Sequence, residues 1–250
     1  MAAASSVFDR LADRYDDLWT NTTAGRLQRE AVWRYLARRF RAGDRILDLG
    51  CGTGEDALHL DRAGVGVSAY DASPGMVRVA RQRGVAADVL ALEDLDRLDG
   101  VGVFDGALSN FGAMNCCANP DRLRAPLARL IRPGGFLALC VIGRFCLWET
   151  VHFLRRGDLR KADRRWSGSS ASAALGLRVF YPTVRRISAA LQPCFTLVQS
   201  VGIGVFVPPS YVHGVSNEVL ERCAAADRRV AHLPGVRALS DHRLLIFVRC

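Results

Sequence analysis

Hydrophobic and polar residues follow two different periods along the chain, and the two periods alternate. Short apolar runs of strand type, bounded by glycine or turn residues, occupy residues 45–49, 65–70, 86–90, 103–109 and 136–142. Stretches with the apolar spacing of a helix lie before and between them, at residues 24–40, 55–63, 74–83 and 120–131. Strands that are apolar along nearly their whole length and alternate with helices predict a parallel sheet covered on both faces.

The pattern changes after Gly143 and then returns. Residues 145–165 have the spacing of one long helix with a very basic end, and a small strand pair is expected within residues 175–181. Alternation resumes with a helix over 183–191, a strand over 195–207, a helix over 215–231 and a terminal strand over 244–249. The predicted fold class is α/β: a doubly wound, seven-stranded, mostly parallel sheet of the Rossmann-like type, with a small helical and strand insert after the fifth strand.

Composition limits the classes of protein and of partner. The chain has 250 residues, half of them hydrophobic, which suits one globular domain and excludes disordered, collagen-like and coiled-coil proteins. A net charge of +9 suggests nucleic acid or an anionic membrane as partner. Lys161 is the one lysine among 34 basic residues, however, and the arginines are scattered along the chain. This distribution is more typical of a coding bias than of a phosphate-binding surface, so no nucleic-acid partner is expected.

Cysteine and histidine usage gives no sign of a metal or a redox centre. The eight cysteines contain no Cys-x-x-Cys spacing and the five histidines are dispersed. No apolar run approaches the roughly 18 residues that a membrane span needs, and the first ten residues lack the apolar centre of a signal peptide. We therefore expect a reduced, cytoplasmic protein without a metal.

The segment with the clearest chemistry is DLGCGTG at residues 48–54, which joins the first strand to the next helix. Open parallel sheets bind ligands at this edge, where glycines let a ligand lie against bare backbone. A nicotinamide site would place its third glycine one residue later, where Glu55 stands. The carboxylate of Asp48 would repel a pyrophosphate but attract an ammonium or sulfonium group. Asp71, at the end of the next strand, is placed to accept the hydroxyls of a ribose, so the pattern indicates S-adenosylmethionine.

On these residues the sequence resembles the class I S-adenosylmethionine-dependent methyltransferases. The matching pieces are the DLGCGTG segment, Asp71, the Ala-Asp-Val run at 87–89 and the Leu-Ile-Arg-Pro-Gly-Gly-Phe run at 130–136, and the likeness covers most of residues 8–142. The resemblance implies S-adenosyl-L-methionine as cofactor, bound by Tyr15, Asp48, Gly50, Cys51, Gly52, Gly54, Asp71, Ala72, Asp88, Val89 and Asn110.

The resemblance also implies a role for each part of the cofactor site. The three glycines would line the methionine and the ribose, Asp71 would hold the ribose, and Asp88 and Val89 would flank the adenine. Asn110 would border the transferred methyl group. We expect a single domain over residues 1–250, in which residues 1–24 form a lid that brings Tyr15 over the cofactor. Residues from about 145 to 182 would form the insert that selects the acceptor.

Polar side chains after the carboxyl ends of the strands are candidates for contact with a methyl acceptor. The catalytic candidates are His213, Tyr211, Asn115 and Arg144. His213 is the first choice for a general base, which a hydroxyl or carbon acceptor needs and a deprotonated amine or thiolate does not; an ordinary loop histidine is the alternative. Arg144 would suit an acidic group, and a role in capping a strand end is its alternative.

The basic stretch Arg155–Arg165 has three readings. A solvated face is favoured, contact with anionic lipid headgroups comes second, and an acidic substrate or carrier protein comes third. A membrane-surface contact is therefore possible but not favoured.

The expected function is transfer of a methyl group from S-adenosylmethionine to a small-molecule acceptor, through an oxygen, nitrogen, carbon or sulfur atom that the sequence leaves open. One alternative is an enzyme of the same fold that binds the cofactor for another reaction, such as decarboxylation or cyclisation. The other is a non-catalytic partner subunit. Ser109-Asn110-Phe111-Gly112 follows the fourth strand in place of an Asn-Pro-Pro-Tyr type run, which argues against methylation of nucleic-acid bases.

Overall fold

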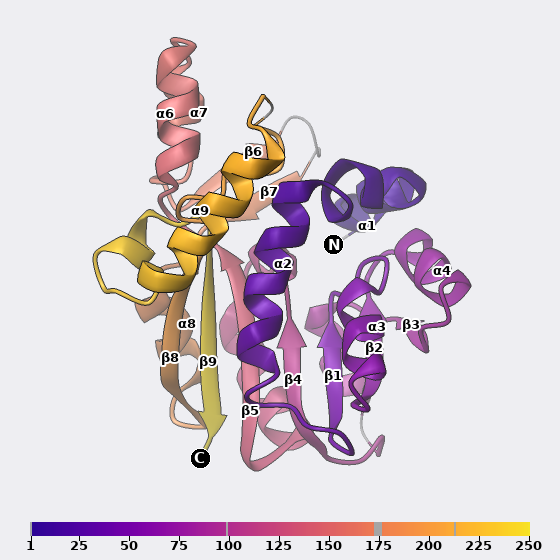
Figure 1. The fold of residues 1–250 in the computed structure, drawn as a ribbon. Coiled ribbons are helices and arrows are strands. Elements are labelled where there is room, and N and C mark those ends of the chain that lie inside the picture. The colour runs from indigo at the N-terminus through magenta and orange to yellow at the C-terminus, as the bar shows by residue number, and fades with distance from the viewer. Residues whose placement is uncertain (1, 99, 173–176, 213) are drawn as a thin grey trace.

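Seven strands form one sheet in the order β3-β2-β1-β4-β5-β9-β8 (Figure 1). The computed structural model describes residues 2–98, 100–172, 177–212 and 214–250. Strand β9 runs antiparallel to both of its neighbours, and the other strands are parallel to one another. This arrangement confirms the predicted fold class. The strands are β1 Arg45–Leu49, β2 Gly66–Asp71, β3 Ala87–Val89, β4 Phe104–Ser109, β5 Ile131–Ile142, β8 Phe195–Ile203 and β9 His242–Arg249.

Helices cover both faces of the sheet. One face packs against α2 and α3, with α9 beside α2, and the other face packs against α5 and α8. In order, these helices and the others are α1 Ala2–Leu11, α2 Thr23–Leu36, α3 Glu55–Arg62, α4 Pro74–Gln82, α5 Arg124–Leu130, α6 Leu147–Arg155, α7 Leu159–Ala162, α8 Val184–Leu191 and α9 Asn217–Val230. None of the helices in the described part of the chain is long and apolar enough to cross a membrane.

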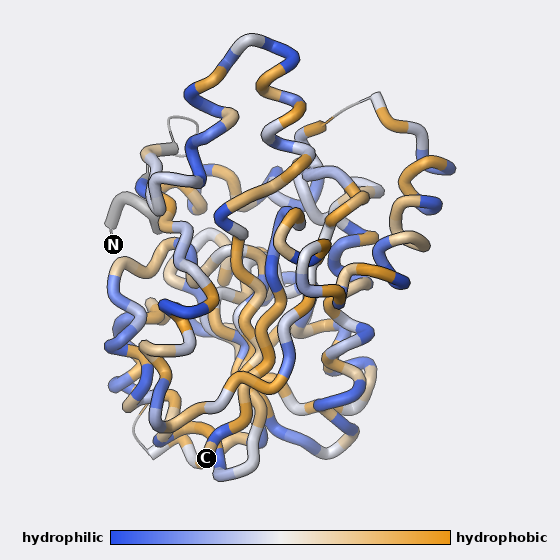
Figure 2. The backbone as a smooth tube through the Cα atoms, turned by 90° about the vertical axis from the view of Figure 1, so that its left-hand side faces the viewer, coloured by the Kyte–Doolittle hydropathy of each residue, from blue (hydrophilic) through white to orange (hydrophobic). Residues whose placement is uncertain are grey.

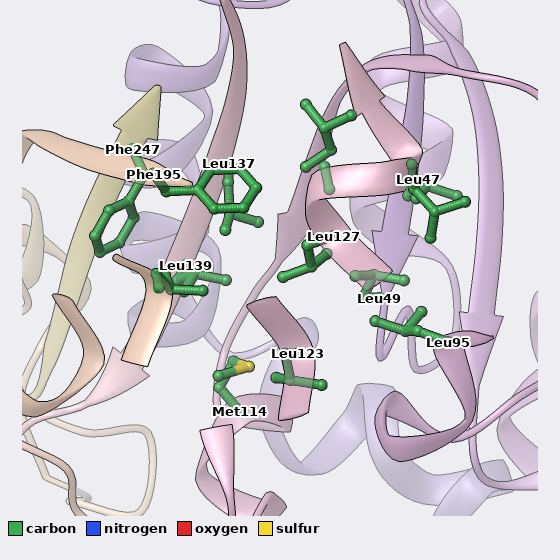
Figure 3. Close-up of a cluster of buried hydrophobic side chains, with 14 of the residues drawn as sticks. Leu47, Leu49, Leu95, Met114, Leu123, Leu127, Leu137, Leu139, Phe195 and Phe247 are labelled. Carbon is green, nitrogen blue, oxygen red and sulfur yellow. The ribbon is translucent and has the colours of Figure 1, made fainter. Parts of the chain in front are cut away.

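The core lies on the two faces of the central strands because successive strand residues point to opposite sides. Along β5, Leu137 and Leu139 join the cluster beneath α5 and α8, which Figure 3 shows, while Ala138 and Cys140 join the cluster beneath α2 and α3. The tube in Figure 2 is accordingly most hydrophobic along the central strands and most hydrophilic along the outer helices. This two-sided burial explains why the strands are apolar along nearly their whole length.

The predicted long helix over residues 145–165 is wrong. The chain forms α6 and α7, two antiparallel helices that project from the body of the molecule (Figure 1), and we call this pair, residues 147–162, the hairpin. Gly157 ends α6 in the left-handed region, with φ of +70°. Asp158 then caps α7, since its carboxylate accepts a hydrogen bond from the amide of Lys161 at 3.1 Å.

The predicted small strand pair exists, but it starts earlier. Strand β6 (Ser169–Ser172) pairs with β7 (Leu177–Phe180) as an antiparallel ribbon. Residues 173–176, which fall within the predicted range, lie outside the described residues. Helix α1, over residues that carried no predicted helix, precedes two short helical turns, η1 Ala12–Arg14 and η2 Asp16–Thr20.

Candidate cofactor and acceptor site

Strand register brings the predicted cofactor residues to one edge of the sheet. Leu49 pairs with Tyr70, and Asp48 pairs with Leu108, so the carboxyl ends of β1, β2 and β4 lie side by side. The glycine loop follows β1 at this edge. Gly50 has φ of +79°, and a Cβ atom on it would lie 2.2 Å from the Cβ of Ala113. Only glycine fits this close approach, so the loop presents bare backbone.

A polar hollow opens on one side of the glycine loop. Five of the predicted cofactor residues line it: Tyr15, Gly50, Cys51, Gly52 and Asn110. The other lining residues are Arg29, Thr53, Glu55, Asp56 and Phe111. Segments as distant in sequence as the junction of η1 and η2, α2 and the end of β4 therefore meet at one place.

A second hollow, mainly apolar, opens on the other side of Gly50. Its lining residues are Leu49, Gly50, Tyr70, Leu90, Ala91, Leu92 and Leu95. Asp88 and Val89 are not among them: Asp88 forms an ion pair with Arg81 at 2.5 Å and its side chain is 71% exposed. The geometry thus favours the residues just after β3 over Asp88 and Val89 for a flat apolar ligand group. Gly50 belongs to both hollows, so a ligand with one polar and one apolar end can cross the loop there.

Asp48 is buried next to the polar hollow with an unsatisfied oxygen. Its Oδ2 has no hydrogen-bond partner. Burial raises the pKa of this carboxyl well above its ordinary value, and the nearby carboxylate of Asp56 adds to the effect, while Arg29 opposes it. A buried carboxylate in this state gains most from a cationic ligand.

Asp71 braces the glycine loop. One carboxylate oxygen accepts a hydrogen bond from the amide of Gly52 at 2.9 Å, and the other accepts from the amide of Ser73 at 2.8 Å. Burial raises the pKa of Asp71, and these two amide donors oppose the rise. Ala72 lies between Asp71 and Ser73 in the sequence. Gly54 has a packing role, because a Cβ atom there would lie 2.7 Å from Val85.

Sequence reasoning missed the ion pair of Arg29 with Asp56. The Asp56 carboxylate accepts from Arg29 Nη1 at 2.5 Å, from Asn110 Nδ2 at 3.0 Å and from Trp33 Nε1 at 2.6 Å. Arg29 Nε is buried without a hydrogen-bond partner. Arg29 lies in α2 and Asp56 lies in α3, 27 residues later in the sequence, so no local sequence pattern predicts the pair.

The N-terminal segment contacts the glycine loop and the start of α4 through residues 9–16. Asp16 accepts a hydrogen bond from Thr53 in the glycine loop at 2.7 Å, and burial raises the pKa of Tyr15. Asp9 accepts from the hydroxyl of Ser73 at 2.6 Å and from the amide of Gly75 at 2.7 Å, at the start of α4. The segment is thus attached to the glycine loop and to the start of α4, while its action as a lid stays a prediction.

The structure gives three of the four catalytic candidates other contacts. Asn115 is fully buried, and its amide bonds the backbone of Ile142 and the carbonyl of Phe180. Arg144 donates to the carbonyl of Trp166, and the Tyr211 hydroxyl donates to Glu149. Burial raises the pKa of Tyr211, so this phenol stays protonated as a donor. These contacts hold loops in place, and the catalytic roles stay predictions. His213 lies outside the described residues.

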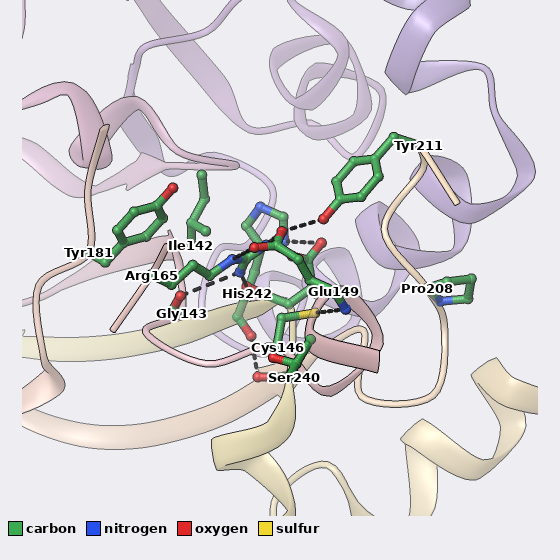
Figure 4. Close-up of polar contacts among 12 residues, drawn as sticks. Ile142, Gly143, Cys146, Glu149, Arg165, Tyr181, Pro208, Tyr211, Ser240 and His242 are labelled. Atoms are coloured by element: carbon green, nitrogen blue, oxygen red, sulfur yellow. Dashed lines mark hydrogen bonds and ion pairs between the residues drawn. The ribbon is translucent and has the colours of Figure 1, made fainter. Parts of the chain in front are cut away.

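A charged cluster surrounds Glu149 at the base of the hairpin (Figure 4). Arg164 and Arg165 each form two hydrogen bonds with its carboxylate, at 2.7–3.0 Å, and Arg165 also bonds Asp241 at 2.8 Å. The arginines hold the pKa of Glu149 below its ordinary value despite burial. These ion pairs give Glu149 a structural role at the base of the hairpin.

His242 adds a titratable ring at the edge of this cluster. It begins β9 and pairs with Ile142 at the end of β5, so it lies at the carboxyl edge of the sheet. Its Nδ1 lies 3.2 Å from Oδ2 of Asp241, a contact that is an ion pair only when the ring is protonated, and its other ring nitrogen points away from the cluster (Figure 4). His242 and Arg165 together hold the pKa of Asp241 well below its ordinary value.

Phe111 stands between His242 and the polar hollow. Its ring meets the His242 ring edge to face, with 5.1 Å between centroids, and Arg29 lies 4.9 Å from its centroid. Phe111 has φ of +45°, which is strained for a bulky side chain and is typical of functional sites. The sequence offered no signal for His242, because only the sheet brings the start of β9 beside the end of β5.

Comparison with known proteins finds methyltransferases that are similar to this chain. Residues 47–139 match the family described as methyltransferase domain. A demethylmenaquinone methyltransferase of Mycobacterium marinum is 36% identical over 142 residues, which cover 54% of this chain and 58% of the relative. One from Clavibacter sepedonicus is 33% identical over 159 residues, covering 61% of this chain and 62% of the relative. The chain thus matches about three fifths of the length of these curated relatives.

Solved structures share the fold over most of the chain. A Burkholderia thailandensis 1,6-didemethyltoxoflavin-N1-methyltransferase, with 1,6-didemethyltoxoflavin and S-adenosylhomocysteine bound, aligns with a TM-score of 0.58 and 21% identity, over 99% of this chain and 87% of that one. An S-adenosylmethionine-dependent methyltransferase of Mesorhizobium loti aligns with a TM-score of 0.55 and 20% identity, over 84% and 92%. Residues 47–139 thus match the methyltransferase-domain family, and the chain shares its fold with solved S-adenosylmethionine-dependent methyltransferases.

Proposed function

We propose that this protein transfers a methyl group from S-adenosylmethionine to a small-molecule acceptor. The observation that carries the proposal is the pair of hollows that share Gly50, one polar and one apolar, beside the unpartnered carboxylate of Asp48. A zwitterionic nucleoside needs these three features together: an apolar place for a base, bare backbone, and a negative charge for its cation.

The residues present fit this cofactor. Asp48 offers the negative charge for an ammonium or sulfonium group, and the buried, unpartnered Nε of Arg29 offers a donor for a carboxylate. Leu90 and Leu92 would hold the adenine in the apolar hollow. Asp71 accepts one amide bond on each oxygen and keeps lone pairs for ribose hydroxyls. When bound, S-adenosylmethionine supplies an electrophilic methyl carbon on a positively charged sulfur.

His242 is the residue we propose as general base for the acceptor. Asp241 faces Nδ1 of its ring and would stabilise the imidazolium, and Arg165 fixes Asp241. The other ring nitrogen, Nε2, would take the proton from a hydroxyl group of the acceptor. That oxygen, or a ring carbon conjugated with it, would then attack the methyl carbon of the cofactor. The named relatives act on demethylmenaquinone, so we propose a hydroxylated aromatic ring, such as a quinol, as the acceptor class. A cytoplasmic location remains a prediction.

Calorimetric titration with S-adenosylmethionine and S-adenosylhomocysteine tests the cofactor site. We expect binding by the wild type and a loss of at least tenfold in affinity for Asp71→Ala. The matched control is Asp61→Ala, which removes an exposed carboxylate that lines neither hollow and is expected to bind as the wild type does. Wild-type protein that binds neither nucleoside would contradict the proposal and would favour the non-catalytic subunit.

A screen with radiolabelled methyl donor against quinol, phenol, amine, thiol and carboxylate acceptors tests the reaction. With a quinol or phenol acceptor, His242→Asn should lower kcat by roughly 10²–10⁴-fold, the usual contribution of a general base, and leave the KM for the donor unchanged. The control is His232→Asn, which changes an exposed histidine just after the end of α9. Donor binding without methyl transfer to any acceptor would favour the alternative of non-methylating chemistry, and an unchanged kcat in His242→Asn would remove its proposed role.

A further inference from the structure

The outer end of the hairpin exposes two large apolar side chains. Leu154, near the end of α6, is 50% exposed, and Leu159, at the start of α7, is 66% exposed. Both belong to what we call the tip, residues 154–161. Figure 1 shows the hairpin projecting beyond the other helices, and Figure 2 shows hydrophobic and hydrophilic positions alternating along it. Half of Leu154 and more than half of Leu159 stay in water, so this apolar surface is free to be buried against a partner.

Three unpaired arginines accompany the leucines at the tip. Arg155, Arg156 and Arg160 are exposed, and none of them forms an ion pair with any residue that the structure describes. Lys161 is the one tip cation with a partner there, Asp158, at 3.0 Å. The tip therefore presents a positive, partly apolar surface.

The hairpin is held firmly at its base. Glu149, in the first turn of α6, is buried and bonds both Arg164 and Arg165. Trp148 donates a hydrogen bond from Nε1 to the carbonyl of Phe206 at 2.7 Å. Because α6 follows directly from the end of β5, the tip points outward from the carboxyl edge of the sheet, the edge that holds the two hollows. The tip has a defined direction relative to the site.

We propose that the tip docks on an anionic lipid bilayer. Leucines flanked by arginines suit the bilayer interface, where apolar side chains enter the acyl boundary and arginines reach phosphate groups. Nucleic acid or an acidic protein surface would satisfy the arginines but would leave both leucines in water. Docking would turn the carboxyl edge toward the membrane, where a lipophilic acceptor would reside; this consequence rests on the proposed function, whereas docking itself does not.

Sedimentation of the full chain with lipid vesicles tests the proposal without cofactor or acceptor. We expect binding to vesicles of 30% phosphatidylglycerol in phosphatidylcholine, weaker binding at high salt, and little binding to pure phosphatidylcholine. Each basic side chain at such a surface contributes about fivefold in affinity, so Arg155→Ser, Arg156→Ser and Arg160→Ser together should weaken binding by about 100-fold. The combined Leu154→Ser and Leu159→Ser variant should weaken it by roughly tenfold or more.

Two control variants separate docking from general charge and hydrophobicity. Arg41→Ser, Arg62→Ser and Arg97→Ser together remove three exposed arginines near the amino edge of the sheet. Val103→Ser with Val198→Ser removes two valines that are 55% and 50% exposed. Both controls should bind vesicles nearly as the wild type does. Their affinities would overturn the proposal if they fell as far as those of the tip variants.

Two further outcomes would overturn it. One is wild-type protein that does not bind anionic vesicles. The other is tight, tip-dependent binding to polyglutamate without binding to vesicles, which would assign the tip to an acidic protein. S-adenosylmethionine titration of the same preparations reports separately on the proposed function, so the two proposals fail independently.

Discussion

At the scale of single residues, Asp48 combines burial with an oxygen that lacks a hydrogen-bond partner. Such a carboxylate destabilises the free protein, because charging it in a buried position costs free energy. We expect Asp48→Asn to raise the Tm of the free protein by about 2–4 °C, which corresponds to about 1 kcal/mol in a chain of this size. The same change should weaken S-adenosylmethionine binding by at least tenfold, since it removes the charge that attracts the cation.

Differential scanning calorimetry and titration of the same variant check both effects. Asp61→Asn, which changes an exposed carboxylate at the end of α3, is the control and should alter neither quantity. A variant of Asp48 that melts lower and still binds as the wild type does would show that Asp48 is a structural residue.

The sequence could predict those site residues whose positions the backbone fixes. The glycine loop and Asp71 follow adjacent parallel strands, so their meeting is a consequence of topology. Arg29 and His242 could not be found in this way, because α2 and the start of β9 reach the site only through tertiary packing. The adenine contact of Asp88 stays a prediction, because a strand of three residues gives little evidence of where its edge ends.

At the scale of elements, the N-terminal segment is fastened by carboxylates spaced along one side of it. Asp9 bonds the start of α4, Asp13 pairs with Arg78 at 2.6 Å, and Asp16 bonds Thr53. The contact of Asp9 resembles a capping interaction, because a carboxylate at a helix N-terminus is favourable. Loss of such contacts should release the segment without unfolding the sheet.

Asp9→Ala combined with Asp16→Ala tests this attachment. We expect faster tryptic cleavage within residues 10–14 and roughly tenfold weaker S-adenosylmethionine binding, with the urea midpoint of the sheet nearly unchanged. Asp17→Ala, at an exposed neighbour of Asp16, is the control. Cleavage at the wild-type rate in the double variant would mean that other contacts hold the segment.

Elements were easier to predict than their interruptions. The strands of the sheet and the helices that cover it can be predicted from the period of hydrophobic positions alone. The break between α6 and α7 instead depends on two adjacent residues. Gly157 adopts a positive φ and Asp158 caps the next helix. Glycine followed by aspartate is a signal for the end of one helix and the start of the next. The apolar spacing continues across these two residues, so the spacing alone predicts one helix.

At the scale of the whole molecule, alternation of strands and helices was enough to predict the sheet, because crossover connections between parallel strands are right-handed. The direction of the hairpin was not predictable. It depends on the buried cluster of Glu149, Arg165 and Asp241, whose members come from three separate segments. The net charge of +9 also does not show where the positive charge lies on the surface. Ion pairs with carboxylates neutralise several arginines, whereas three arginines of the tip have no such partner among the residues that the structure describes.

The buried carboxylates also decide how the stability of the whole molecule changes with pH. The pKa of Asp48 is raised in the folded protein above its ordinary value of 3.8. Its stabilising contribution is therefore fully present below 3.8 and is lost as the pH rises through the folded-state pKa. Asp241 and Glu149 have lowered pKa values, so their contribution is lost only as the pH falls below their ordinary range. Between pH 5 and pH 7, Asp48 is thus expected to penalise the free protein more at the higher pH.

Comparing wild type with Asp48→Asn isolates this effect from the titration of other groups. The variant should exceed the wild type in Tm by more at pH 7 than at pH 5. Saturating S-adenosylmethionine should stabilise the wild type more at pH 7, because its positive charge favours ionised Asp48 and binding at lower pH must first release that proton. A Tm difference that is equal at both pH values, or larger at pH 5, would contradict a raised pKa of Asp48 in the free protein.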